Sequence, residues 1–77
     1  MVFLGTLTVD GGIDMYLENK DGTYLVLYKS RVYGSYMYFN LDGMILASTF
    51  KNKLYEEILY HELMLRMDYV KSKICYL

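Results

Sequence analysis

The residues best suited to chemistry in this sequence are its single histidine and the acidic residues near it. The stretch YHELM, residues 60–64, shares its histidine and glutamate with the zinc-protease motif H-E-x-x-H, in which two histidines bind the metal. The second histidine is missing, because Leu65 occupies its place. Glu57 and His61 have i,i+4 spacing, but zinc needs at least three protein ligands and the sequence offers no third one. We therefore expect no metal site, and a surface pair of Glu57 with His61.

Cys75 is the only cysteine, so it cannot form a disulfide within the chain. A nucleophilic pair would need it to meet His61, fourteen residues earlier on the same predicted helix. At a rise of 1.5 Å per residue the two side chains would be about 21 Å apart, far beyond hydrogen-bond reach. Asp10 and Asp14 flank a tight turn and have no acid–base partner in the sequence. We expect neither an enzyme nor a cofactor.

Two short segments, NKDG at residues 19–22 and NLDG at residues 40–43, share the middle of a calcium-binding EF-hand loop. If Asp21 held position five of that loop, positions one and twelve would be Leu17 and Tyr28, which are not carboxylates. The second copy would place Tyr38 and Thr49 there. We interpret both segments as turns.

Closely spaced turn signals divide the first fifty residues into short apolar segments. Asp-Gly occurs at residues 10–11, 21–22 and 42–43, and Gly34 lies between the last two. Asp-Gly between apolar runs is a strong hairpin signal, and strands joined by short turns are usually neighbours in the sheet. We predict a five-stranded antiparallel meander, open or curled into a small barrel. Its expected strands are Val2–Val9, Ile13–Glu18, Thr23–Ser30, Ser35–Leu41 and Met44–Ser48.

The last third of the chain has the pattern of a helix. From Lys51 to Lys73 there is no glycine or proline, and apolar residues recur three or four positions apart. Ser48 or Thr49 could cap its first turn. We predict one long helix within residues 50–75, packed on one face of the sheet formed by residues 1–49. The fold class is therefore α+β, with residues 1–77 as one domain.

Tyrosines recur at even positions of the predicted strands, whereas odd positions are almost all aliphatic or Phe. Because side chains alternate across a sheet, we expect the helix to cover the odd face and the tyrosines to lie on the other. Five clustered aromatic residues could form a contact surface, since Tyr is enriched at interface hot spots. The alternative is a solvated face on which tyrosines only pair across strands. The predicted binding residues are Tyr16, Tyr24, Tyr28, Tyr36 and Tyr38.

The predicted helix carries two apolar stripes, and one small sheet can cover only one of them. The first stripe contains Leu54, Ile58, Leu65, Tyr69 and Tyr76. We expect the second stripe to contact another copy of the chain, although a single broad core face is the alternative. The expected oligomer interface is Leu59, Leu63, Met67, Val70 and Ile74.

Composition narrows the function. The 77 residues have a net charge of −1, without the basic excess of a general nucleic-acid binder. The N-terminus lacks the features of a signal peptide, and no apolar run reaches the roughly 18 residues that span a bilayer. We therefore expect a soluble, cytoplasmic protein.

The function expected from these features is a small non-catalytic protein-interaction module, acting as an inhibitor, adaptor or regulator. Its partners would be a second copy of itself and an unidentified protein. By analogy, accessory proteins of phages and mobile elements often have this character. The alternative is single-stranded nucleic-acid binding, with stacking tyrosines and a basic rim at Lys29 and Arg31.

Overall fold

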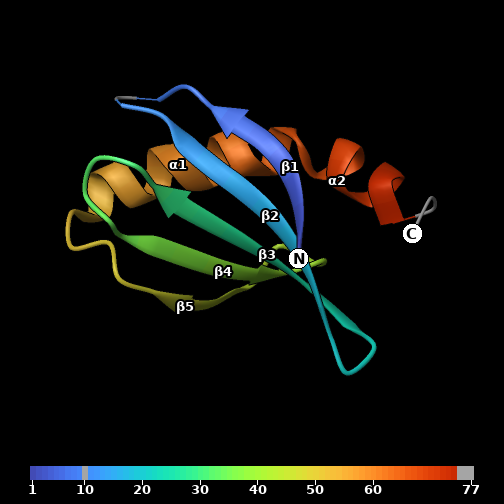
Figure 1. Ribbon diagram of the computed structural model, residues 1–77. Helices are drawn as coiled ribbons and strands as arrows, with labels where there is room; N and C mark the ends of the chain where they lie inside the picture. Colours follow the sequence, from blue (N-terminus) through green and yellow to red (C-terminus); the bar gives the residue numbers. More distant parts are fainter. Residues whose placement is uncertain (10, 75–77) are drawn as a thin grey trace.

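Five antiparallel strands form one open sheet in the order β1-β2-β3-β4-β5, and the helices lie against one of its faces (Figure 1). This arrangement comes from a computed structural model, which describes residues 1–9 and 11–74. It confirms the predicted α+β meander with a C-terminal helical region. Within the described part, no helix is both long and apolar enough to cross a membrane. The strands are β1 Val2–Leu7, β2 Ile13–Lys20, β3 Thr23–Ser30, β4 Tyr36–Asn40 and β5 Ile45–Ser48.

The two Asn-x-Asp-Gly segments form the turns that follow β2 and β4. In the first, Asp21 and Gly22 have φ values of 53° and 81°, the positive angles that a two-residue type I′ turn needs. The Gly22 N–H donates to Oδ1 of Asn19 at 3.1 Å. In the second, Oδ1 of Asn40 accepts from the N–H groups of Asp42 and Met44 at 3.0 and 2.9 Å. The asparagine of each repeat therefore fixes its own turn.

The register of the hairpins reverses the predicted facing of β3. Lys20 pairs with Thr23, so cross-strand partners in β2 and β3 have numbers that add up to 43, and an odd residue always faces an even one. Partners share a face of the sheet. Met15 and Leu17 of β2 therefore lie on the same face as Tyr28 and Val26 of β3. The prediction that even residues of β3 face away from the helices is wrong.

Strand β1 changes face within its length. Phe3 pairs with Tyr16, whereas Gly5 pairs with Met15, so a bulge interrupts the register between Phe3 and Gly5. As a result, Leu4 and Leu7 are both buried although their numbers differ in parity, and Phe3 is exposed on the opposite face. Bulges insert one extra residue in this way and bend the strand.

Two helices replace the single predicted one. Helix α1 spans Lys53–Leu65 and α2 spans Met67–Ile74. At Arg66 the backbone φ is −102°, and its N–H donates to Leu63 O, three residues back, at 2.9 Å. This tighter bond ends α1, while the Val70 N–H donates to Arg66 O and begins the next turn at 3.0 Å. Cys75 and Tyr76, assigned to the helix from the sequence, lie outside the described residues.

Helix α1 begins later than predicted, because Asn52 rather than Ser48 or Thr49 caps it. Oδ1 of Asn52 accepts from the Tyr55 N–H at 3.0 Å, which satisfies one of the free amides of the first turn. Ser48 and Thr49 form hydrogen bonds at the end of the sheet instead. Ser48 Oγ accepts from the Phe50 N–H, and Thr49 Oγ1 accepts from the Tyr36 N–H.

The core lies between the sheet and the helix stripe that was predicted to bind another copy. Leu59, Leu63 and Val70 are completely buried, and Met67 is 8% exposed. Ile74 packs against the same cluster. The predicted oligomer interface is therefore wrong: four of these residues are buried in the core of one chain, and Ile74 is partly buried against it. The first stripe faces outward instead, with exposed Leu54, Ile58, Leu65 and Tyr69.

Candidate interaction surfaces

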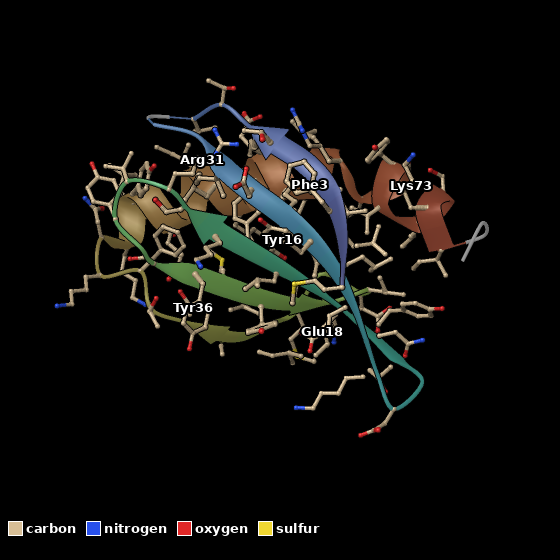
Figure 2. All side chains as sticks on the ribbon, in the orientation of Figure 1. Phe3, Tyr16, Glu18, Arg31, Tyr36 and Lys73 are labelled. Carbon is tan, nitrogen blue, oxygen red and sulfur yellow. The ribbon has the colours of Figure 1, made fainter. Side chains whose placement is uncertain are left out.

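An uninterrupted row of apolar and aromatic residues crosses the sheet face that the helices leave bare. Each strand contributes one residue, and each residue is the cross-strand partner of the next. Figure 2 looks onto this face, where Phe3 and Tyr16 lie over adjacent strands. We call the row the apolar ladder; its members are Phe3, Tyr16, Leu27, Tyr38 and Ala47.

Aromatic rings contact one another at two places on this face. The rings of Phe3 and Tyr16 have centroids 5.3 Å apart, and Phe3 is 53% exposed. Tyr36 meets Tyr38 edge to face at 5.7 Å. Burial, and after it the nearby Glu18 carboxylate, raise the pKa of Tyr38. The face is thus apolar at its centre and carries hydroxyl groups at its edge.

One flank of the ladder is an ion pair braced by a hydroxyl group. Arg31 Nη2 lies 2.7 Å from Asp14 Oδ1 and donates to Thr6 Oγ1 at 2.9 Å, while Thr6 Oγ1 donates to the same carboxylate at 2.9 Å. The hydrogen bond from Arg31 is the main cause that lowers the pKa of Asp14, against a smaller opposing effect of desolvation. Arg31 is therefore committed to Asp14, and Lys29 is the other cation on this flank.

The other flank carries the carboxylate of Glu18 and the ammonium group of Lys20. Glu18 follows Tyr16 on the same face of β2 and pairs with Leu25, which is half-buried. A shallow hollow of about 280 Å³ lies there, lined by Glu18, Lys20, Leu25, Tyr38, Leu46 and Ala47. The ladder thus lies between a flank with Lys29 and a flank with Glu18.

The structure brings together three of the five tyrosines predicted to bind. Tyr16, Tyr36 and Tyr38 share the bare face, whereas Tyr24 and Tyr28 lie on the helix face. Tyr28 is fully buried against Phe39, with ring centroids 6.3 Å apart, and burial raises its pKa above the ordinary value. Tyr24 packs against the edge of the core. The prediction is wrong for these two residues, because the two-residue turn moves them to the other face.

Sequence reasoning also missed members of the bare face. Phe3 reaches it through the bulge in β1, and Leu25 and Leu27 reach it through the register of β3. The length of the Asp-Gly turn could have placed the two leucines, because a two-residue loop pairs odd with even positions. Gly5, an isolated glycine within the predicted strand, is the local signal that could have indicated the bulge.

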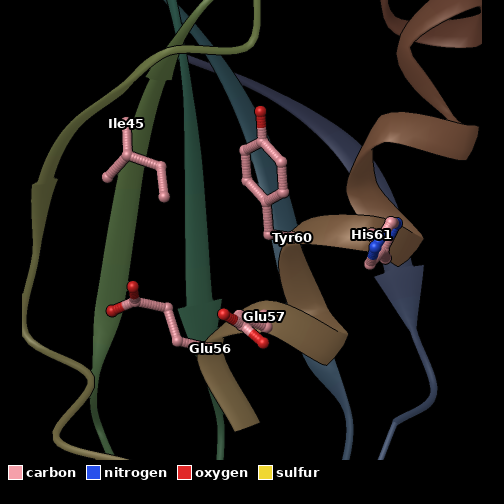
Figure 3. A pocket seen from close by; sticks show the side chains of 5 residues that line it. All are labelled: Ile45, Glu56, Glu57, Tyr60 and His61. Carbon is pink, nitrogen blue, oxygen red and sulfur yellow. The ribbon is translucent and has the colours of Figure 1, made fainter. Parts of the chain in front are cut away.

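A groove opens on the helix side of the sheet, between β5 and α1. Its volume is about 370 Å³, and Figure 3 shows Ile45 on one side and residues of α1 on the other. Tyr60 crosses toward the sheet and its hydroxyl donates to Gly43 O at 2.9 Å. Ser48 Oγ donates to Glu56 Oε2 at 2.8 Å, which fixes one acidic side chain beside the strand. The lining residues are Ile45, Glu56, Glu57, Tyr60 and His61.

His61 and Glu57 line this groove without the predicted pairing. Both side chains belong to exposed residues, and among the described residues no hydrogen bond or ion pair joins them. In the part of the chain that the structure describes, no three His, Cys, Asp or Glu side chains are grouped closely enough to hold a metal ion. Cys75 and Asp10, considered above for chemistry, lie outside the described residues.

Comparison with protein-family models, with curated proteins and with solved structures finds no match for this chain.

Proposed function

We propose that this protein is a small non-catalytic interaction module that acts as a homo-oligomer through its bare sheet face. The observation that carries the proposal is the apolar ladder, which spans all five strands on a face that no other part of the described chain covers. Contiguous exposed apolar surface on a small domain usually serves an interface. Aromatic residues on a flat sheet are suited to this, since they provide contact area with little loss of side-chain freedom.

The size of the face suits a second copy. Strands about 4.8 Å apart and about 20 Å long give a five-stranded face of roughly 480 Å² in projection. Because side chains project from the sheet, the accessible area of the face is larger than its projection and approaches the roughly 800 Å² per partner of a standard interface. Two such faces can pack as aligned sheets about 10 Å apart, with the helices on the outside of both layers.

The charges on the face also suit a second copy. Lys29 and Glu18 lie on opposite flanks of the ladder. A two-fold axis along the ladder places Glu18 of one copy on the side of Lys29 of the other, while the aromatic residues meet at the centre. Such an isologous contact brings opposite charges together.

The test is the oligomeric state of the wild-type protein and of two matched variants. We expect sedimentation equilibrium at 1–200 µM to give a dimer. Phe3→Ser/Tyr36→Ser should weaken dimerisation at least tenfold, because it removes two exposed aromatic residues of the face. The control is Leu65→Ser, which removes an even more exposed apolar residue from the outer side of α1 and should leave the dimer intact. A 9.1 kDa wild-type species at every concentration would overturn the proposal.

Single-stranded nucleic-acid binding receives less support from the same geometry. Arg31, part of the expected basic rim, is paired with Asp14, and Glu18 lies on the same face. Two of the expected stacking residues, Tyr24 and Tyr28, face the helices. A labelled oligothymidine that shifts with the protein at low salt, and is released as salt rises, would favour this function over self-association.

A further inference from the structure

The two edges of the sheet differ in how they are closed. At β1, the long side chains of α2 and its junction reach the strand: Tyr69 Oη donates to Leu4 O at 3.2 Å, and Arg66 Nη1 to Thr6 O at 3.4 Å. At β5, all four residues are exposed. Within residues 1–9 and 11–74, no hydrogen bond from outside the sheet reaches the backbone of Ile45–Ser48. The sheet therefore has one covered edge and one open edge.

The open edge has only part of the usual protection against strand addition. Sheet edges are normally guarded by charged side chains, proline, or bulges that turn the strand away. Residues 44–50 contain no charged residue and no proline. Met44 and Leu46 are 59% and 50% exposed, and β5 carries one bulge, at Leu46, opposite Tyr38 and Phe39. An extended chain could add to β5 without displacing any described group.

The groove beside this edge has a definite chemistry. Its floor is apolar at Ile45 and Tyr60, and its wall carries the carboxylates of Glu56 and Glu57 (Figure 3). No lysine or arginine lines it, and the nearest described ion pair is a loose contact of 3.8 Å from Lys53 to Glu56. Glu57 has no ion pair among the described residues. The groove is therefore negative and lies directly alongside an open strand.

We infer that β5 and the groove bind an extended, basic segment of another protein by antiparallel strand addition. Alternate side chains of an added strand point to opposite faces. Every second residue of the segment would enter the groove and, if it is Lys or Arg, meet Glu57 and Glu56. The residues between them would lie beside Leu46 on the bare face, where apolar side chains fit. Backbone hydrogen bonds supply affinity in this mode, and the alternate side chains supply selectivity.

Charge argues for a basic partner rather than for a second copy at this edge. Pairing β5 with β5 of another molecule would bring two acidic grooves side by side, and β5 itself contributes no cation. Like charges brought together at an interface oppose the contact. The site also goes beyond the proposed function: the apolar ladder and the groove lie on opposite faces of the sheet, so a dimer would carry two free grooves.

The test uses a fluorescein-labelled, terminally blocked peptide, Thr-Val-Lys-Val-Lys-Val-Thr, and measures anisotropy and amide chemical shifts of the protein. We expect binding in the micromolar to low millimolar range, with shifts concentrated at residues 45–48 and 56–61. A control peptide with Glu in place of both Lys should bind at least tenfold more weakly. Glu57→Gln should weaken binding of the lysine peptide about three- to tenfold, whereas Asp68→Asn, the same charge change on α2, should not.

Backbone methylation separates strand addition from simple charge attraction. In an added strand, only every second residue of the peptide directs its N–H toward β5. N-methylation of the two lysines and N-methylation of the valines should therefore differ: one should abolish binding and the other should not. Equal effects of the two methylations, equal binding of the glutamate peptide, or no binding at millimolar concentration would overturn the inference. Dimerisation through β5, seen as shifts at residues 45–48 on raising the protein concentration without peptide, would overturn it as well. These outcomes are distinct from loss of the ladder dimer, which Phe3→Ser/Tyr36→Ser reports.

Discussion

The hydroxyl of Tyr28 is a buried polar group placed in an apolar core. The ring is fully buried and meets Phe39 edge to face, and among the described residues the hydroxyl has no hydrogen-bond partner. Leaving such a group unsatisfied costs about 1–3 kcal/mol. The ring therefore stabilises the core by packing, while its oxygen opposes part of that gain.

Replacement of Tyr28 by Phe should accordingly leave the protein at least as stable as the wild type. We expect Tyr28→Phe to raise the free energy of unfolding by about 1 kcal/mol, because the ring contacts remain and the desolvated hydroxyl is removed. Urea unfolding at pH 7 measures this. Tyr24→Phe, at a half-buried position, is the control and should change little. A Tyr28→Phe protein less stable than the wild type would mean that the hydroxyl has a partner.

The same variant should also change how stability depends on pH. Burial raises the pKa of Tyr28 in the folded protein, whereas an unfolded tyrosine loses its proton near pH 10. Above pH 10 the unfolded state therefore binds fewer protons, and this residue lowers stability by roughly 1.4 kcal/mol per pH unit until its folded pKa is reached. Tyr28→Phe lacks this loss. Its advantage over the wild type should widen between pH 9 and pH 11 in urea unfolding, and a constant difference would contradict the burial of the hydroxyl.

At the scale of the elements, the sequence predicts the strands, the turns and the fold class, because each depends on local chemistry. Asp-Gly turns and period-two alternation are readable residue by residue, and all five strands lie close to their expected bounds. Which residues of β3 face the core depends on the length of the loop between Lys20 and Thr23. Because this loop has two residues, odd positions of β2 pair with even positions of β3. The bulge in β1 has a local signal in Gly5, whereas the break at Arg66 has no glycine or proline to mark it.

The same distinction applies to the candidate surfaces. Three tyrosines of the bare face were predicted from parity, but Phe3 and Leu27 required the register of neighbouring strands. The groove between β5 and α1 could not be predicted, because it depends on which side of the helix lies over the open edge. Glu57 was noted in the sequence only as a companion of His61.

The start of α1 gives a prediction about one element. Asn52→Ala should lower the free energy of unfolding by about 1 kcal/mol, because its side chain accepts the Tyr55 N–H in the first turn of α1. Asn52→Asp should retain the cap and most of the stability. The control Lys51→Ala, one residue earlier and exposed, should have little effect. If Asn52→Ala left the free energy of unfolding unchanged, Asn52 would not be the cap of α1.

The whole molecule is a two-layer protein with one stripe of its helical layer in the core and one face of its sheet in contact with solvent. Both helix stripes are apolar, so composition alone cannot decide which one meets the sheet. The contacts of Arg66 and of Tyr69 in α2 with the carbonyls of β1 agree with this choice, because they form while Leu63 and Val70 point inward. The orientation of the helical layer also leaves β5 open, since α1 lies over the sheet and not around its edge.

This layering predicts opposite outcomes for two leucines on α1 that are two positions apart. Leu63 is completely buried and Leu65 is 80% exposed. Leu63→Ala should cost about 2–5 kcal/mol through lost contacts and a cavity, a large part of the roughly 4–12 kcal/mol expected for a domain of this size. Leu65→Ala should change stability by no more than about 0.5 kcal/mol. Both variants have the same change in helix propensity, so the comparison isolates burial.

Urea unfolding followed by circular dichroism gives both values, with Leu63→Val as a milder variant if Leu63→Ala does not fold. Equal costs, or a larger cost for Leu65→Ala, would place the other stripe of the helix against the sheet.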